Sequence, residues 1–165
     1  MISIIAAVSE DLGLGRNNDL LWYIPEDLKR FKRLTYGKTV VMGKRTWESL
    51  PLKPLPGRKN IVISDIPGDS FENALTACSI EDAMDKCGHD GEIFIIGGAS
   101  IYRQFMPYAG RLYITHVHMN KPADVFFPEI DMSRWKVVER EEYRDTGQES
   151  IPYSYIVYER KEPGS

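Results

Sequence analysis

The chain has 165 residues, a formal net charge of −3 and a hydrophobic fraction of 42%. This length supports one sizeable core and is short for two ordinary domains, so we expect a single domain comprising residues 1–165. The small negative charge gives no general attraction to nucleic acid or anionic lipid, and no apolar run is long enough for a membrane span.

Apolar and β-branched runs recur along the chain and alternate with helical patterns, which is typical of an α/β fold. The predicted strands are Ile2–Val8, Thr39–Met42, Asn60–Ser64, Glu92–Ile96 and Leu112–Val117. Continuous apolar runs of this kind suit parallel strands that are covered on both faces. Trp135–Tyr143 and Tyr153–Arg160 follow each other without a helix between them, which predicts an antiparallel pair. The pattern therefore favours one mixed sheet with a few flanking helices.

The segment Ser9–Ile24 lacks a clear periodicity and is the longest irregular stretch of the chain. Loops of this length inside a compact domain are more often lids or binding loops than passive connections. Because the segment follows the first strand, we expect it to gate a site beside that strand.

A helix is expected to begin at Pro25 and to end near Thr35. Asp27 is the one charge in its apolar face, whose other members are Leu28, Phe31, Leu34 and Thr35. Such a carboxylate can simply complement the positive start of the helix. Alternatively, it binds a cationic or doubly hydrogen-bond-donating ligand, such as a 2-aminopyrimidinone ring.

One candidate phosphate site is the Gly97-Gly98 pair, which follows an apolar strand and precedes a helical pattern. Glycines allow the backbone to approach a ligand, and a helix start favours an anion. A glycine turn kept for close packing fits the sequence equally well.

A second candidate follows Gly43, where Lys44 and Arg45 open the next helix. Cations at a helix start oppose the helix dipole. Their position is explained if they bind an anion such as a ribose 2′-phosphate, or if they are solvated surface cations.

The cysteines and histidines predict no disulfide and no metal site. Cys78 and Cys87 lack metal-ligand spacing, and Cys87 continues a helical apolar series, so we interpret it as a buried structural thiol. His116 and His118 share one strand face, but no third ligand is apparent.

Taken together, these blocks resemble dihydrofolate reductase. The segments that carry the resemblance are ISIIAAV, W-x-x-P-x-D-L from Trp22 to Leu28, FKRLT, VVMGKRTWESL, PLPGRKNIVIS, EIFIIGGASIY, LYITHV and FFPEID. The resemblance implies a dihydrofolate-reductase-like α/β fold with a central mixed eight-stranded sheet and four helices. It also implies a monomeric cytoplasmic enzyme that reduces dihydrofolate with NADPH for one-carbon metabolism, binds antifolate inhibitors, and has no nucleic-acid or membrane partner.

On the substrate side, the resemblance assigns Asp27 to the pterin N3 and 2-amino group and to protonation at N5. Thr115 would support Asp27 through a water, and Arg58 would pair with the glutamate α-carboxylate. The implied catalytic residues are Asp27, Trp22, Thr115 and Leu20. The implied substrate-binding residues are Ile5, Ala6, Asp27, Leu28, Phe31, Leu50, Arg58 and Thr115.

On the cofactor side, the resemblance implies that Lys44, Arg45 and Ser64 lie near the adenosine 2′-phosphate. The loop containing Leu20 and Trp22 would close over the nicotinamide and exclude water. The implied NADPH-binding residues are Ala7, Gly15, Leu20, Gly43, Lys44, Arg45, Thr46, Ser64, Ile96, Gly97, Gly98, Ala99, Ser100, Ile101 and Tyr102.

The sequence departs from the usual family pattern at three places. Leu21 replaces a common proline before Trp22, and the Pro51–Lys53 stretch is longer by one residue than in some bacterial relatives. Lys44 stands where arginine is frequent, so Arg45 would contribute more to phosphate recognition.

Two alternatives remain open at this point. A pyrimidine reductase of riboflavin synthesis is similar in fold and also uses NADPH, but it would not need the W-x-x-P-x-D block or Arg58. A nucleotide-binding module without catalysis would not need Trp22, Asp27 and Thr115.

Overall fold

The central sheet has eight strands in the computed structural model, which describes residues 1–17, 19–144 and 151–162. The strand order is β10-β11-β8-β1-β7-β4-β5-β6. The bounds are β1 Ile2–Val8, β4 Thr39–Gly43, β5 Lys59–Ile63, β6 Leu75–Ala77, β7 Ile93–Ile95, β8 Arg111–Val117, β10 Trp135–Arg144 and β11 Pro152–Arg160. Neighbours from β6 to β8 pair parallel, whereas β11 pairs antiparallel with both β8 and β10. The predicted mixed sheet is confirmed.

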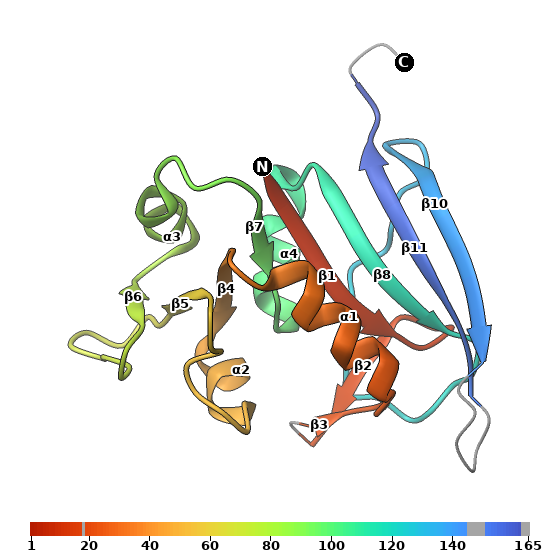
Figure 1. Ribbon diagram of the computed structural model, residues 1–165, viewed down its shortest axis with the longest axis horizontal. Coiled ribbons are helices and arrows are strands. Elements are labelled where there is room, and N and C mark those ends of the chain that lie inside the picture. Colours follow the sequence, from red (N-terminus) through yellow and green to blue (C-terminus); the bar gives the residue numbers. More distant parts are fainter. Residues whose placement is uncertain (18, 145–150, 163–165) are drawn as a thin grey trace.

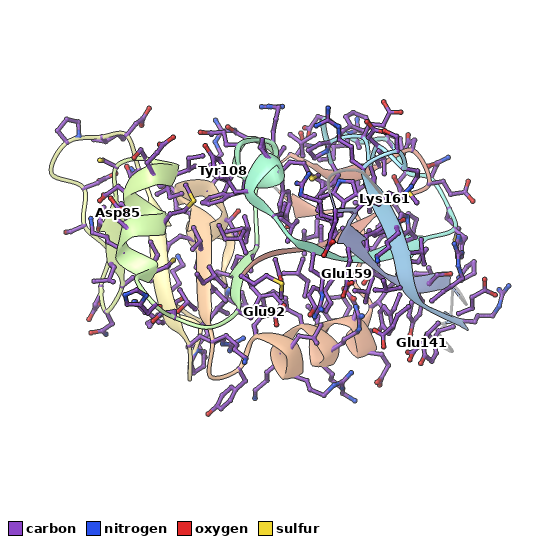
Figure 2. All side chains as sticks on the ribbon, turned by 90° about the horizontal axis from the view of Figure 1, so that it is seen from above. Asp85, Glu92, Tyr108, Glu141, Glu159 and Lys161 are labelled. Atoms are coloured by element: carbon purple, nitrogen blue, oxygen red, sulfur yellow. The ribbon has the colours of Figure 1, made fainter. Side chains whose placement is uncertain are left out.

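Helices cover both faces of this sheet. Their bounds are α1 Pro25–Thr35, α2 Lys44–Ser49, α3 Ile80–Cys87 and α4 Ala99–Phe105, and a 3₁₀ turn η1, Met106–Tyr108, follows α4. Figure 1 shows α1 in front of the sheet and α4 behind it, and the view from above in Figure 2 shows them on opposite sides. The four helices predicted to flank the sheet are therefore present in the described part of the chain.

The alternation of side chains along each strand separates the core into two layers. In β1, Ile4 packs with residues of α3 and α4, whereas Ile5 packs with Trp47 of α2 and with Phe31 of α1. In β7, Phe94 belongs to the second of these layers. Both layers are apolar, which explains why these strands have continuous rather than alternating apolar sequences.

The prediction that Ser9–Ile24 is irregular was wrong. It contains β2 (Gly13–Arg16) and β3 (Asp19–Leu20), which join β9 (Val125–Phe126) in a three-stranded sheet. The short Gly-Leu-Gly-Arg strand has little intrinsic strand preference, and its partner β9 lies far along the chain. Local sequence patterns therefore gave no sign of it.

Several contacts fasten this segment to the connection between β8 and β9. The Asp124 N–H donates to the Gly15 carbonyl at 3.0 Å, and its carboxylate accepts from the Asn17 N–H at 2.9 Å. Lys121 Nζ donates to the Leu21 carbonyl at 3.2 Å and lies 4.4 Å from the centre of the Trp22 ring. The segment that we expected to be a gate is thus docked on a neighbouring loop.

The cysteines and histidines have structural contacts. Both thiols are free, and Cys87 is buried as predicted, whereas Cys78 is exposed. The His116 ring lies 2.9 Å from the Tyr158 hydroxyl, and the His118 ring lies 2.5 Å from Ser154 Oγ. None of the helices in the described ranges combines the length and apolar character needed to cross a bilayer.

Candidate active site

The floor of the candidate site is formed by β1, β8 and β11. Strand register places Ala7, Thr115 and Tyr155 in one row and Ile5, Tyr113 and Val157 in the next row on the same face. The second row packs with Phe31 and Leu34 of α1. The two rows therefore present a mixed polar and apolar surface to α1.

Asp27 reaches this floor from the first turn of α1. Pro25 occupies the start of the helix, where its missing N–H costs nothing, and Asp27 follows two residues later. The Thr115 hydroxyl donates to Asp27 Oδ1 at 2.5 Å. This direct bond corrects the expectation that a water lies between the two side chains, because α1 approaches β8 closely enough for contact.

The environment of Asp27 makes its carboxyl harder to ionise than that of an exposed aspartate. Burial raises the pKa of the Asp27 carboxyl above its ordinary value, although the Thr115 hydrogen bond and the positive charge of Arg30 act in the opposite direction. A carboxyl with a raised pKa can exchange a proton closer to neutral pH than an exposed aspartate can. The carboxylate that the sequence placed on the apolar face of α1 therefore differs from an exposed aspartate in its pKa.

Arg30 was not predicted as a site residue. Its guanidinium carbon lies 4.0 Å from the centre of the Tyr155 ring, within cation–π range. Asp27 and Arg30 are three residues apart, so they are neighbours on the helix surface. This spacing is the sequence signal that could have placed Arg30 beside Asp27.

An apolar wall lies along the Phe31 edge of α1. Phe31 and Leu50 are partly buried against the cluster that includes Ile5 and Trp47. Leu28 is 43% exposed. The structure thus brings Ile5, Phe31 and Leu50 together and leaves Leu28 at the rim.

The side chain of Ala6 lies elsewhere. It packs with Ile4 and Val8 in the layer beneath α3 and α4, on the opposite face of β1 from Ile5. Residues adjacent in a strand point to opposite faces, so its side chain does not share the surface formed by its neighbours.

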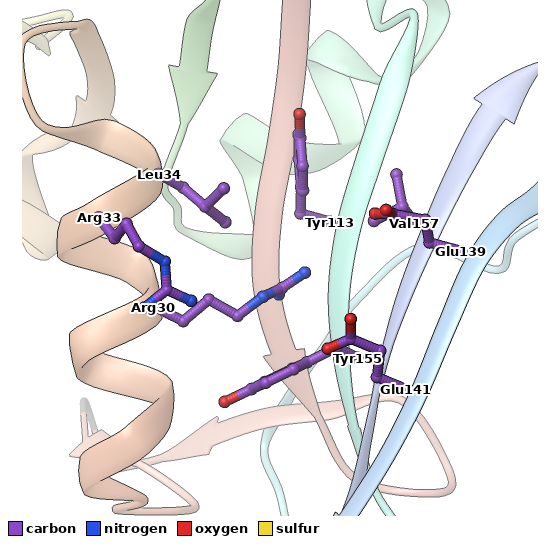
Figure 3. A pocket seen from close by; sticks show the side chains of 8 residues that line it. All are labelled: Arg30, Arg33, Leu34, Tyr113, Glu139, Glu141, Tyr155 and Val157. Carbon is purple, nitrogen blue, oxygen red and sulfur yellow. The ribbon is translucent and has the colours of Figure 1, made fainter.

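A cavity of about 180 Å³ lies between α1 and the strands β8, β10 and β11 (Figure 3). Its lining residues are Arg30, Arg33, Leu34, Tyr113, Glu139, Glu141, Tyr155 and Val157. At 100° per residue, Arg30 and Leu34 lie on one edge of the inward face of α1, and Leu28 and Phe31 lie on the other. Because the cavity lining includes neither Asp27 nor the motif glycines Gly43, Gly97 and Gly98, we place the candidate site on the Phe31 edge.

Arg58 lies at the far end of α1. Its Nη1 donates to Thr35 Oγ1 at 3.1 Å, and its Nε donates to the Pro56 carbonyl at 2.9 Å. Thr35 is buried and donates in turn to the Phe31 carbonyl at 2.8 Å. The helical rise separates Thr35 from Asp27 by roughly 12 Å along the axis. A carboxylate and a guanidinium therefore lie at opposite ends of one helix.

The two glycine segments meet at the ends of β4 and β7. The Gly43 N–H donates to the Gly97 carbonyl at 2.9 Å. Gly97 has φ of +135°, and a Cβ atom there would lie 3.1 Å from Thr46 Oγ1. Gly97 is therefore required both for its backbone conformation and for space.

The start of α4 adjoins this glycine cradle, by which we mean Gly43, Thr46, Gly97 and Gly98. A Cβ atom at Gly43 would lie 3.1 Å from Ile101 Cγ1. The Tyr102 hydroxyl donates to the Ile5 carbonyl at 2.8 Å, which joins α4 to β1. The other residues predicted to bind the cofactor here, Ile96, Ala99 and Ser100, lie between the end of β7 and the first turn of α4.

Lys44 and Ser64 also meet, through a residue that we did not predict. Asp69 Oδ2 lies 2.9 Å from Lys44 Nζ and accepts from Ser64 Oγ at 2.6 Å. The hydrogen bonds from Ser64 and Lys44 hold the pKa of Asp69 below its ordinary value. Arg45 is exposed. No motif links Asp69 to Lys44, so the sequence carried no signal for this contact.

The two predicted loop residues differ in exposure. Leu20 is 74% exposed, whereas Trp22 is buried. Gly15 is buried within β2. The Trp22 Nε1 atom is buried and has no hydrogen-bond partner among the residues that the structure describes. A buried indole N–H normally has a partner, so this atom is available to a water or a ligand.

Comparison with known proteins identifies close relatives. Residues 1–160 match the family model for dihydrofolate reductase. The chain is 40% identical to the dihydrofolate reductase of Bacillus subtilis strain 168, over 98% of this chain and 95% of that protein. It is 47% identical to the dihydrofolate reductase of Neisseria gonorrhoeae, over 95% of this chain and 96% of that protein.

A solved structure extends this similarity to the fold. It is dihydrofolate reductase from Enterococcus faecalis complexed with NADP(H) and RAB-propyl, with a TM-score of 0.91 and 32% sequence identity. The alignment covers 98% of this chain and 97% of that chain.

The raised pKa of Asp27 predicts that its ionised form destabilises the fold. Well below the unfolded pKa of about 3.9, the carboxyl is protonated in both folded and unfolded chains, so it has no such effect. As pH rises through the unfolded and then the folded pKa, the unfolded chain loses its proton first and stability falls. Asp27→Asn should therefore have a higher melting temperature than the natural chain at pH 7 and no advantage at pH 3. Thermal unfolding followed by circular dichroism at both pH values checks this, and a lower melting temperature at pH 7 contradicts it.

Proposed function

Because the chain belongs to the dihydrofolate reductase family, we propose that it reduces 7,8-dihydrofolate to 5,6,7,8-tetrahydrofolate with NADPH. When bound, NADPH supplies a hydride to pterin C6 and is released as NADP⁺, while a proton is added at N5. The observation that carries this proposal is the largely buried Asp27 carboxyl, which Thr115 fixes on the strand floor.

Asp27 binds the pyrimidine edge of the pterin. Its carboxylate accepts hydrogen bonds from N3 and the 2-amino group, and the negative charge favours the protonated ring. Thr115 fixes the orientation of the carboxylate through Oδ1, and the remaining lone pairs of both oxygens can accept from the substrate. Asp27 thereby promotes protonation at N5 through its charge, while C6 receives the hydride.

The length of α1 suits an elongated substrate. Phe31, Leu50 and Ile5 contact the apolar body of the molecule, and Leu28 covers it at the rim. Arg58 pairs with the glutamate α-carboxylate at the far end, where Thr35 and Pro56 already orient its guanidinium. This arrangement binds both ends of dihydrofolate through opposite charges.

The glycine cradle fits a group that approaches the backbone closely. Gly97 leaves open the volume that a Cβ atom would fill next to Thr46, and Gly43 does the same next to Ile101. The main-chain N–H groups at the start of α4, from Ala99 onward, follow Gly98 directly and suit the pyrophosphate of NADPH. The remaining residues that we assign to the nicotinamide half are Ala7, Ile96, Ser100 and Tyr102.

The adenosine end is assigned to Lys44, Arg45 and Ser64. Two cations and a hydroxyl can bind a ribose 2′-phosphate, which NADH lacks. This role explains why two cations stand at the start of α2, where they oppose the helix dipole.

The loop between β1 and α1 excludes water from the reacting atoms. We assign Leu20 and Gly15 to contacts over the nicotinamide, and Trp22 to a water or substrate atom through its unpartnered indole N–H. Closure of the loop holds the two reacting rings together, and exclusion of water strengthens the electrostatic interaction between Asp27 and the pterin.

The proposal places the enzyme in the cytoplasm. Cys78 and Cys87 are both free thiols, which is usual for proteins of a reducing compartment.

The proposed role of Asp27 is tested by Asp27→Asn. This variant should fold but lose about 10²–10⁴-fold in dihydrofolate-dependent NADPH oxidation at pH 7, because an amide cannot carry the charge that favours a protonated pterin. Its hydride-transfer rate should rise as pH falls from 9 to 5, since solvent then supplies the proton, while NADPH affinity changes little. Stopped-flow absorbance measures this rate. Glu26→Gln, at the exposed neighbouring position, is the matched control and should behave like the natural chain; natural-level rates in Asp27→Asn contradict the assignment.

Arg58→Leu should raise the Michaelis constant for dihydrofolate by roughly 10²-fold, because a bidentate charged pair is lost. The rate with a dihydropterin that lacks the glutamate tail should be unchanged. Arg33→Leu removes an exposed arginine from α1 and serves as the control. Equal losses with both substrates would mean that Arg58 supports the fold rather than the tail.

Replacing Lys44 and Arg45 together by glutamate should weaken NADPH binding by at least about 10²-fold and weaken NADH binding far less. Only NADPH carries the 2′-phosphate that these cations are proposed to bind. Fluorescence titration with each cofactor provides the measurement, with Lys136→Glu on β10 as a charge-reversal control. Equal weakening of the two cofactors would remove these residues from the 2′-phosphate site.

A further inference from the structure

Asp69 occupies an unexpected position in the proposed 2′-phosphate subsite. A single oxygen, Asp69 Oδ2, contacts both Lys44 Nζ at 2.9 Å and Ser64 Oγ at 2.6 Å. A cation and a hydroxyl that meet on one anionic oxygen are the partners expected for a phosphate oxygen. The carboxylate of the protein itself therefore occupies the hydrogen-bonding positions assigned to the ligand.

The carboxylate is held in this position by the structure around it. Ser64 is buried at the end of β5, and its N–H donates to the Ala77 carbonyl at 2.9 Å. The Asp69 N–H donates to the Ile66 carbonyl at 3.2 Å, which closes a turn that contains Gly68 with φ of +81°. The contact is thus part of a defined turn and not a chance meeting of two long side chains.

The charge balance at this subsite is unusual for a site that binds a phosphate. Lys44 and Arg45 are positive, whereas Asp69 and the nearby Asp65 and Glu48 are negative, and all three acids act on the Lys44 charge. A 2′-phosphate that approaches Lys44 must also approach Asp69, which repels it. Either the carboxylate moves away or the phosphate binds more weakly than the two cations alone would allow.

A cofactor without the 2′-phosphate is not repelled by Asp69. A ribose 2′-hydroxyl can donate a hydrogen bond to a carboxylate, and acidic side chains recognise NAD in this way in other dinucleotide sites. The Lys44–Asp69 ion pair can remain intact when such a cofactor binds. The same side chain thus disfavours one cofactor and is compatible with the other.

We propose that Asp69 is a specificity-determining residue that competes with the adenosine 2′-phosphate for Lys44 and Ser64, and so narrows the preference for NADPH over NADH. This inference rests on the proposed function, which assigns Lys44, Arg45 and Ser64 to the 2′-phosphate. It adds a residue that opposes phosphate binding within that subsite.

The test measures binding at the adenosine end alone. Isothermal titration calorimetry with adenosine 2′,5′-bisphosphate and with 5′-AMP compares the same ligand with and without the 2′-phosphate. Asp69→Asn keeps an acceptor for Ser64 but removes the charge, so it should bind the bisphosphate about tenfold more tightly. Its affinity for 5′-AMP should not increase, and the ratio of NADPH to NADH affinity should rise by the same factor.

Two variants control for general effects of charge and for folding. Asp65→Asn removes an equal charge from an exposed aspartate in the same loop, and it should change bisphosphate binding less than about twofold at 0.15 M salt. Asp69→Ser gives a second neutral side chain if the asparagine variant has a lowered melting temperature.

The outcomes separate the inference from the proposed function. The inference is overturned if reversal of Lys44 and Arg45 weakens the bisphosphate selectively but neither Asp69 variant binds it more tightly than Asp65→Asn does. Equal tightening of 5′-AMP would also overturn it, since the effect would then not concern the phosphate. If reversal of the two cations fails to discriminate the ligands, the subsite assignment itself is wrong.

Discussion

The hydrogen bond between Thr115 and Asp27 joins β8 to the first turn of α1, across 88 positions of the sequence. It holds a charged group against a floor that is otherwise largely apolar, where burial opposes ionisation. With the start of α1 fixed on the sheet, Phe31 packs against the cluster of Ile5 and Trp47, and the end of the helix meets Arg58 through Thr35.

The two ends of the site use charge in different ways. At the pterin end, a single carboxylate is partly buried and its ordinary solvation is replaced by one hydroxyl. At the adenosine end, cations are exposed or partly exposed, and the carboxylate of Asp69 balances Lys44 before any ligand binds. In the proposed function, charge at the first end therefore acts on the reaction, whereas charge at the second end acts on which cofactor is bound.

Much of the fold could be predicted from local sequence. Continuous apolar runs identified the parallel strands β1, β4, β5, β7 and β8, whereas the short parallel strand β6 was missed. The uninterrupted pair at the end of the chain identified β10 and β11. The helical pattern from Pro25 to Thr35 placed Asp27 on the inward face, as the structure has it. These predictions succeeded because burial on both faces of a sheet, or along one face of a helix, leaves a periodic pattern.

Features that depend on contacts between distant segments could not be predicted. The pairing of β2 with β9 and the contact of Asp69 with Lys44 leave no periodic pattern, because each is decided by how separate loops pack. The direct bond between Thr115 and Asp27 depends on the distance between α1 and β8, which sequence patterns do not give. The position of Ala6, by contrast, follows from strand alternation alone, and the family resemblance had obscured it.

The central claim is that Asp27 is a partly buried carboxyl that binds the pterin directly. The ¹³C resonance of its carboxyl, assigned by its absence in Asp27→Asn, can be titrated by NMR without and with bound folate. The account predicts a pKa above that of the exposed aspartates in the free protein and a clear change in this titration when folate binds. A carboxyl that titrates at the ordinary value and does not respond to folate would contradict the account.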